Sequence, residues 1–274
     1  MRIVGLLPQG MDDSRIRSAL APSSFAVFRC DADLMAFLAR TVVHAVIVGA
    51  SDTRSTSSTT TVLELRKRFP SVLVVVYWAS GQTGSSVCAA VRAGADEVVI
   101  AGVDDSRERL THTLREASRY RLATTVHTGL VGILRPDALS FVDCCLNLSW
   151  RPFGVARLAV ERGVSPRTLS SHCRMWGLPE PRVVIAWTRL LLATHLLADP
   201  GRSVEQVADA LGFGAGAGLH NMFRRHVALR PSSIRTGGAQ LVLERFKELL
   251  VTTAINRGLP LHALKIRGAF PGNP

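Results

Sequence analysis

The sequence predicts two domains of different fold class: an α/β domain with a doubly wound, five-stranded parallel sheet, and then an all-helical domain with two helix-turn-helix units. In the first half, short β-branched runs alternate with amphipathic segments, which is typical of parallel strands connected by helices. In the second half the predicted elements are helices, and a helix–glycine–helix pattern occurs twice. A chain of 274 residues is long enough for both domains.

The first half alternates regularly between the two kinds of element. The predicted strands are Arg2–Leu7, Phe25–Arg29, Ala45–Val48, Ser71–Tyr77 and Glu97–Ile100. The predicted helices are Asp13–Leu20, Asp31–Arg40, Val62–Phe69, Ser85–Ala93 and Ser106–Tyr120. The run VLVVVYW is apolar throughout, as expected of a central strand buried on both faces. Ser51–Thr61, in which nine of eleven residues are Ser or Thr, is expected to be a solvated loop, with a phosphosite or ligand loop as the alternative.

One segment of the first half, AVRAGADEVVI at Ala90–Ile100, resembles part of the receiver domain of response regulators. Together with the order of the elements, this resemblance covers residues 1–122. A receiver holds Mg²⁺ with two acidic residues after its first strand, where this chain has Pro8–Gly10. The phosphate-accepting aspartate is replaced by Gly49, and the lysine after the fifth strand by Ala101. Because metal and nucleophile are both needed for phosphoryl transfer, we expect a receiver-like domain that cannot be phosphorylated by this route.

Two similar patterns follow a predicted connection at residues 123–135 and an apolar helix at Asp137–Leu148. In the first, a helix at Val155–Arg162 is stopped by Gly163, and Ser165 is the N-cap of a helix with Pro166 at its first position. In the second, Ser203–Arg235, a serine N-cap and Gln206 form a capping box, and Gly212 stops the helix. The spacing of core positions repeats, since Leu169 and Cys173 correspond to Leu219 and Phe223.

A long apolar helix, Arg182–Ala198, connects the two patterns and is expected to be buried on several sides. Matching residues occur in order across the region, at Leu158-Ala159, Gly163, Ser165–Leu169, Arg189-Leu190, Ala193, Leu196-Leu197, Ser203, Val207-Ala208, Leu211–Phe213, Phe223–Arg225, Pro231 and Arg235. On these residues the segment 136–236 resembles the DNA-binding domain of AraC-type (AraC/XylS family) transcription regulators. The resemblance implies two recognition helices that read adjacent major-groove segments. After the resembling segment, Ala239–Ile255 is predicted to be an amphipathic helix in a C-terminal extension at 237–274.

The resemblance assigns the candidate DNA contacts to these two helices, Pro166–Met175 and Ala217–His226. The candidates are Arg167, Thr168, Ser170, Ser171, Arg174, His220, Asn221, Arg224 and Arg225. Arginine pairs with guanine and asparagine with adenine, although each residue could instead contact phosphate or make no contact. The segment departs from the family pattern at GAGAG, Gly214–Gly218, which supplies no side-chain donors, and at Ala228, where a glycine is expected. We therefore expect the second unit to contribute more phosphate positioning than base reading.

The composition agrees with a nucleic-acid partner. The net charge is +12 with a pI near 10.8, and the excess is concentrated after residue 125. Four of the five cysteines lie in apolar runs, which predicts reduced core thiols, and no apolar run reaches membrane-spanning length. No metal motif, cofactor motif or catalytic cluster stands out, so we expect no enzyme.

We therefore expect a cytoplasmic, nucleoid-associated bacterial regulator whose partners are double-stranded DNA, RNA polymerase and a second copy of the chain, with the first domain serving dimerisation or signal input. Two alternatives remain open. One is an interaction module that no longer binds DNA, and the other is a small-molecule-binding α/β domain fused to helices.

Overall fold

The computed structural model describes residues 2–20, 25–41, 43–50, 58–79, 84–214, 216–234 and 237–258. Two compact units divide the chain: residues 1–121 with 198–203, and residues 122–197 with 204–274. We describe each unit by itself. Residues 51–57 of the predicted polar loop, Arg235 and the tail after residue 258 lie outside the described residues.

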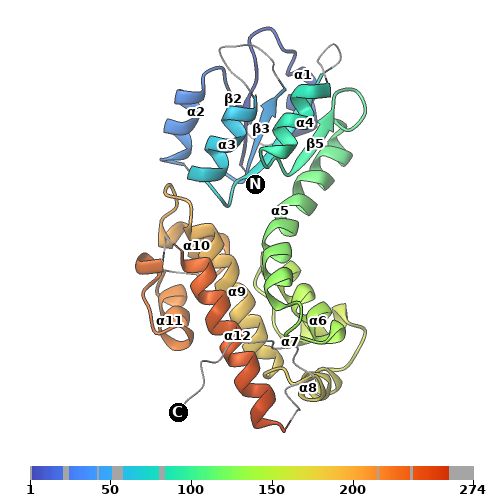
Figure 1. Cartoon of the computed structure of the whole chain (residues 1–274), viewed down its shortest axis with the longest axis vertical. Coiled ribbons are helices and arrows are strands. Elements are labelled where there is room, and N and C mark those ends of the chain that lie inside the picture. The colour runs from blue at the N-terminus through green and yellow to red at the C-terminus, as the bar shows by residue number, and fades with distance from the viewer. Residues whose placement is uncertain are drawn as a thin grey trace. The chain divides into compact units, whose positions relative to one another are not determined.

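The first unit is built on a five-stranded parallel sheet in the order β2-β1-β3-β4-β5 (Figure 1). The strands are β1 Ile3–Leu6, β2 Phe25–Phe28, β3 Ala45–Gly49, β4 Leu73–Trp78 and β5 Glu97–Ile100. This order is that of flavodoxin-like folds, so the predicted receiver-like α/β class is confirmed.

Helices cover both faces of this sheet, as its alternating side chains require. They are α1 Ser14–Leu20, α2 Asp31–Leu38, α3 Ser58–Arg68, α4 Gly84–Arg92 and α5 Arg107–Leu130. Val46, Val48 and Val74 pack with α2, α3 and α4 on one face. Ile47 and Val75 pack with α1 and α5 on the other. The central strands are therefore buried on both sides.

Two predicted boundaries in this half were wrong. Ser58–Thr61, expected in a loop, form the first turn of α3, where the buried Thr61 hydroxyl donates to Asp31 at 3.0 Å. The helix expected to end at Tyr120 continues to Leu130, through most of the predicted connection, because Leu122, Val126 and Leu130 join the core of the helical unit.

The first unit also includes the short segment 198–203, which no sequence pattern predicted. Asp199 accepts a hydrogen bond from the Ser71 backbone N–H at 2.9 Å and pairs with Arg202 at 3.3 Å. Arg202 in turn donates to the Val43 carbonyl at 2.7 Å. Burial lowers the pKa of Arg202, and Asp199 opposes this shift.

The second unit is all-helical and is arranged around α9, Pro181–Leu197 (Figure 1). The other helices are α6 Pro136–Leu148, α7 Val155–Glu161, α8 Pro166–Met175, α10 Val204–Ala210, α11 Gly216–His226, a 3₁₀ turn η1 Pro231–Ile234, and α12 Gly238–Asn256. Twelve of the seventeen residues of α9 are buried, as predicted for a helix packed on several sides. No helix in the described ranges is long and apolar enough to cross a membrane.

The cysteines follow the core prediction only in part. Cys145 and Cys173 are buried and Cys144 is half-buried, but Cys30 and Cys88 are exposed, and all five are free thiols. Burial raises the pKa of Cys173 to about 12, so this thiol stays protonated at neutral pH.

Candidate nucleic-acid interface

The first helix-turn-helix arrangement consists of α7 and α8, and a left-handed glycine ends α7. Gly163 has φ of 64°, and the N–H of Val164 donates to the Ala159 carbonyl at 3.0 Å. This closure is the Schellman motif, which only a residue free of a Cβ adopts without strain. The Ser165 hydroxyl then caps α8 by accepting from the Thr168 N–H at 3.1 Å, as predicted.

The second arrangement repeats this stop with α10 and α11. Gly212 has φ of 67°, and the N–H of Phe213 donates to the Ala208 carbonyl at 2.8 Å. A second left-handed residue, Gly214, follows with φ of 71°. A Cβ on Gly218 would lie 3.0 Å from the Phe213 carbonyl oxygen, so this glycine allows α11 to pack closely against the turn. The structure therefore explains two glycines of GAGAG: Gly214 by its left-handed conformation and Gly218 by its close packing.

An arginine on α9 contacts the turn between α10 and α11. The Arg189 guanidinium lies 4.0 Å from the centre of the Phe213 ring and donates to the Leu211 carbonyl at 2.5 Å. Burial lowers the pKa of Arg189. The sequence pattern contained Arg189 as a family residue but gave it no role, because its partners lie more than twenty positions away.

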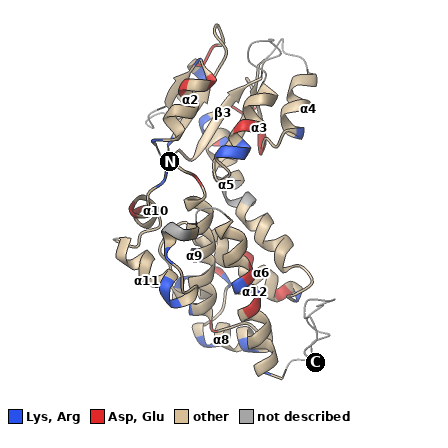
Figure 2. Ribbon diagram, turned by 60° about the vertical axis from the view of Figure 1, so that its left-hand side comes forward, with Lys and Arg blue, Asp and Glu red and all other residues tan. Residues whose placement is uncertain are grey.

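Both recognition helices bury one side and expose the other, as the i, i+4 spacing predicted. Leu169 and Cys173 on α8, and Leu219 and Phe223 on α11, are each at most 1% exposed. Figure 2 marks basic residues on both helices, and their arginines, Arg167, Arg174, Arg224 and Arg225, are exposed. The two helices thus have a fixed core side and a free basic side.

The five candidates on α8 differ in how available they are. Thr168 and Ser165 share a hydrogen bond of 2.8 Å between their hydroxyls, and the half-buried Ser170 donates to the Pro166 carbonyl at 3.1 Å. Among the described residues, three exposed candidates make no hydrogen bond or ion pair: Arg167, Ser171 and Arg174. These three side chains are free to contact a ligand.

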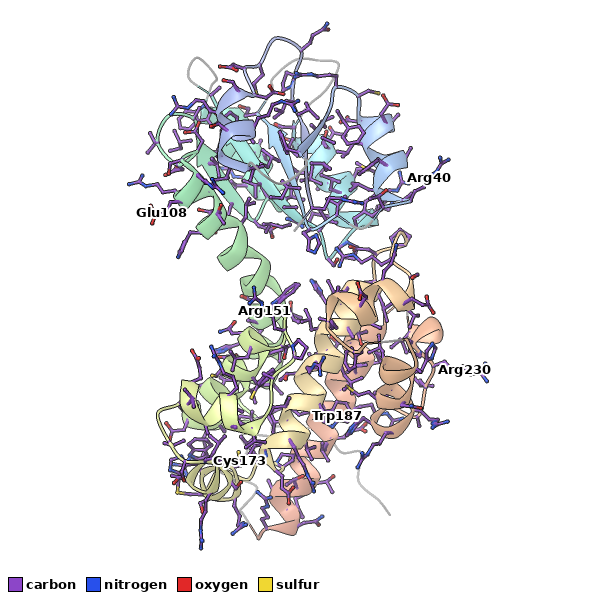
Figure 3. All side chains as sticks on the ribbon, turned by 180° about the vertical axis from the view of Figure 1, so that it is seen from behind. Arg40, Glu108, Arg151, Cys173, Trp187 and Arg230 are labelled. Carbon is purple, nitrogen blue, oxygen red and sulfur yellow. The ribbon has the colours of Figure 1, made fainter. Side chains whose placement is uncertain are left out.

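The four candidates on α11, His220, Asn221, Arg224 and Arg225, are all exposed. Arg224 donates to the Asn221 side-chain oxygen at 3.1 Å, so these two side chains are already bonded to each other. An open cavity of about 490 Å³ lies at the C-terminal half of the helix. It is lined by His220, Asn221, Arg224, Ala228, Leu229 and Arg230 (Arg230 is labelled in Figure 3).

The second residue after α11 is Ala228, where the family pattern has a glycine. Ala228 has φ of 58°, and it is the one residue other than glycine with positive φ in the described part of the chain. A side chain in this conformation costs about 1–2 kcal/mol. The strained residue lies in the wall of the cavity, which sequence reasoning had not located.

Comparison with known proteins assigns this region to a family. Residues 158–237 match the model of a helix-turn-helix domain, and the match runs from within α7 through α8, α9, α10 and α11 to the residue before α12. The segment is therefore a helix-turn-helix domain of the AraC type, and the chain is a DNA-binding transcriptional regulator.

Comparisons over the whole chain add little. A solved structure of RcsB from Salmonella enterica serovar Typhimurium, bound to promoter rprA, matches at 16% identity with a TM-score of 0.35. The match covers 68% of this chain and 98% of RcsB. A search of curated proteins found no match.

A second candidate site is the carboxyl edge of the sheet, where receivers carry their chemistry. A Cβ on Gly49 would lie 2.6 Å from Pro8 Cδ and 3.0 Å from the Met11 sulfur. Pro8 and Met11 therefore fill the space that an acidic side chain at position 49 would need. The sequence showed the missing aspartate, and the structure adds that its space is filled.

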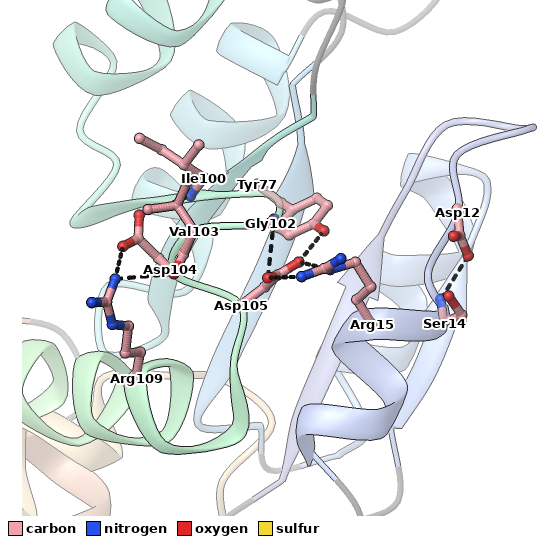
Figure 4. Close-up of polar contacts among 10 residues, drawn as sticks. All are labelled: Asp12, Ser14, Arg15, Tyr77, Ile100, Gly102, Val103, Asp104, Asp105 and Arg109. Atoms are coloured by element: carbon pink, nitrogen blue, oxygen red, sulfur yellow. Dashed lines mark hydrogen bonds and ion pairs between the residues drawn. The ribbon is translucent and has the colours of Figure 1, made fainter.

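Near this edge a buried carboxylate joins several elements (Figure 4). Asp105 accepts hydrogen bonds from Arg15 Nε at 2.9 Å, from the Tyr77 hydroxyl at 2.9 Å and from the Gly102 N–H at 3.0 Å. Burial alone would raise the pKa of Asp105, but these donors outweigh it and lower the pKa. Because its donors already surround it, Asp105 acts as a structural anion in this arrangement.

Proposed function

We propose that this regulator inserts α8 and α11 into two adjacent major-groove segments of its operator, with the first unit serving dimerisation or signal input. One observation supports this proposal above all: within the described residues, Arg167, Ser171 and Arg174 are exposed and unpaired. They lie on a helix whose start is fixed by the Ser165 cap. Fixed helices with free arginines are suited to bidentate guanine contacts. RNA polymerase and a second copy of the chain are the protein partners that we propose.

The two recognition helices have unequal roles in this proposal. On α8, Arg167 lies in the first turn, where recognition helices contact base edges. On α11 the first turn contains only small residues, and the basic groups gather at the cavity near its C-terminal end. We propose that α8 reads bases and that α11 mainly positions the protein on phosphates.

A salt titration tests the DNA-binding proposal. Binding to random-sequence duplex should weaken as salt rises, with a log–log slope proportional to the number of phosphates contacted. Selection from a random duplex library should then recover a motif with two segments. Absence of binding even at low salt would favour the alternative of an interaction module without DNA affinity.

We also propose that the first unit does not respond through phosphorylation at position 49. The filled space at Gly49 and the residues Pro8–Gly10 and Ala101 support this. Incubation with acetyl phosphate and Mg²⁺ should leave the chain unlabelled, and stoichiometric labelling would refute the proposal. The variant Gly49→Asp should also stay unlabelled, because Pro8 and Met11 obstruct the new side chain.

A further inference from the structure

The C-terminal helix α12 begins where the family match ends, at residue 237, and it packs along α9 (Figure 1). Its 19 residues, Gly238–Asn256, span about 28 Å at about 1.5 Å per residue. This length allows one helix to contact both helix-turn-helix arrangements. It contacts η1, which follows the second arrangement, it packs on α9, and through Arg257 it bonds to the end of the first arrangement.

At its first residue, α12 is packed closely against η1, the turn that follows α11. A Cβ on Gly238 would lie 2.7 Å from the Ile234 side chain in η1 and 3.1 Å from Thr194 on α9. A glycine is therefore needed where the helix starts. The start of α12 is fixed against both η1 and α9.

In its middle, α12 is connected to the second recognition helix through α9. Phe246 of α12 stacks on Trp187 of α9, with ring centres 5.6 Å apart and an angle of 17° between the planes. Trp187 also meets His226, in the last turn of α11, edge to face at 5.8 Å. Burial, with a smaller contribution from Arg225, lowers the pKa of His226 and favours its neutral ring in this contact.

At its end, α12 reaches the first recognition helix. The Nη1 atom of Arg257 donates to the Cys173 carbonyl at 3.2 Å and to the Leu178 carbonyl. The Cys173 carbonyl also accepts the Leu178 N–H at 2.8 Å, which closes the Schellman motif that ends α8 at Gly177. Arg257 therefore places a positive charge at the C-terminus of α8. It bonds to the carbonyls of the first and last residues of the turn that closes this helix.

We propose that α12, through Arg257, is a positioning element that sets the orientation of the first recognition helix relative to the second. This inference rests on the proposed function, because orientation matters only if both helices meet one duplex. Arg257 is a positioning residue: it holds the C-terminal end of α8 while the candidate base contact Arg167 lies at the other end. Small rotations of α8 about this end would displace Arg167.

The test compares Arg257→Ala with Arg245→Ala in the full chain. Both variants remove one exposed positive charge from the α12 region, but within the described residues Arg245 pairs only with Glu248 on its own helix, at 3.2 Å. Each variant and the unchanged protein are put through selection from a random duplex library and through salt titrations on random duplex.

For Arg257→Ala we expect base preference to weaken in one segment of the motif and to persist in the other. Affinity for the selected duplex should fall by about tenfold, the usual size of a lost base discrimination, while random-duplex affinity and salt slope match those of Arg245→Ala. Arg257→Lys, which keeps the charge but not the planar fork, should restore part of the preference.

Three outcomes would overturn the inference. An unchanged motif in Arg257→Ala would do so while leaving the proposed function intact. A uniform loss of affinity with a smaller salt slope would instead make Arg257 a phosphate contact. Absence of any DNA binding by the unchanged protein would remove the proposed function and this inference together. If Arg257→Ala does not fold, Arg257→Lys is compared with Arg245→Ala in its place. An unchanged motif in the lysine variant would then contradict the positioning role of Arg257.

Discussion

The two helix-turn-helix arrangements end their first helices in the same way but begin their recognition helices differently. Gly163 and Gly212 close the same hydrogen-bonded turn. After it, α8 starts with a serine cap and Pro166, whereas α11 starts in a glycine-rich stretch whose backbone packs against Phe213. The same glycine stop therefore maintains the shape of both units, whereas the residues after the turn differ, and with them the side chains at the start of each recognition helix.

The largest expected difference concerns the buried i+4 position of each recognition helix. Phe223→Ala should lower the free energy of unfolding of the second unit by about 3–5 kcal/mol, because a fully buried ring leaves a cavity. Cys173→Ala removes only one buried sulfur from the equivalent place and should cost about 1 kcal/mol. Chemical denaturation measures both. Equal costs would show that the two cores do not depend on these side chains in the way their burial indicates.

The two stop glycines provide a closer comparison. A Cβ on Gly163 meets nothing within 4 Å, so Gly163→Ala should cost only the left-handed strain of about 1–2 kcal/mol. A Cβ on Gly212 would lie 2.3 Å from Pro152 Cγ, so Gly212→Ala should cost about 1–3 kcal/mol more. Equilibrium unfolding of both variants gives the difference. A difference near zero would mean that the Pro152 ring moves aside without lowering the free energy of unfolding.

The third comparison concerns DNA reading. Arg167 is exposed and unbonded within the described residues, whereas Arg224 is bonded to Asn221 beside the cavity. Arg167→Ala should relax base preference in one segment and weaken the selected duplex by about 1–3 kcal/mol. Arg224→Ala should weaken selected and random duplexes alike and reduce the salt slope by about one unit. If Arg167→Ala leaves discrimination unchanged, the assignment of base reading to α8 is wrong.

Local patterns predicted the elements well because their signals are local. Short β-branched apolar runs placed all five strands, and Ser165, Gly163 and Gly212 placed the caps and stops of the helices. The family match at residues 158–237 agrees with the resemblance drawn from those same residues. Strand and helix existence, and the exposed sides of α8 and α11, followed from sequence spacing alone.

The features that sequence reasoning missed depend on residues far apart in the chain. Arg257 bonds to a carbonyl 79 positions away, and Arg202 to one 159 positions away, and no periodicity signals such pairs. The filling of the space at Gly49 depends on Pro8 and Met11 from another loop. The glycine at position 49 marked the absence of a phosphate-accepting aspartate, and the packing adds that Pro8 and Met11 occupy the space that a side chain at this position would need.

The smallest expected effect tests the strain at the end of α11. Ala228 holds φ of 58°, so Ala228→Gly removes left-handed strain while adding backbone freedom to the unfolded chain. The net result should be a gain of about 0.5–1 kcal/mol in the free energy of unfolding, measured by denaturation. Ala217→Gly, the same substitution at an exposed site within α11, is the matched control and should lose up to about 1 kcal/mol. If both variants lose stability equally, the left-handed residue is not strained, and the family's glycine at this position would need another explanation.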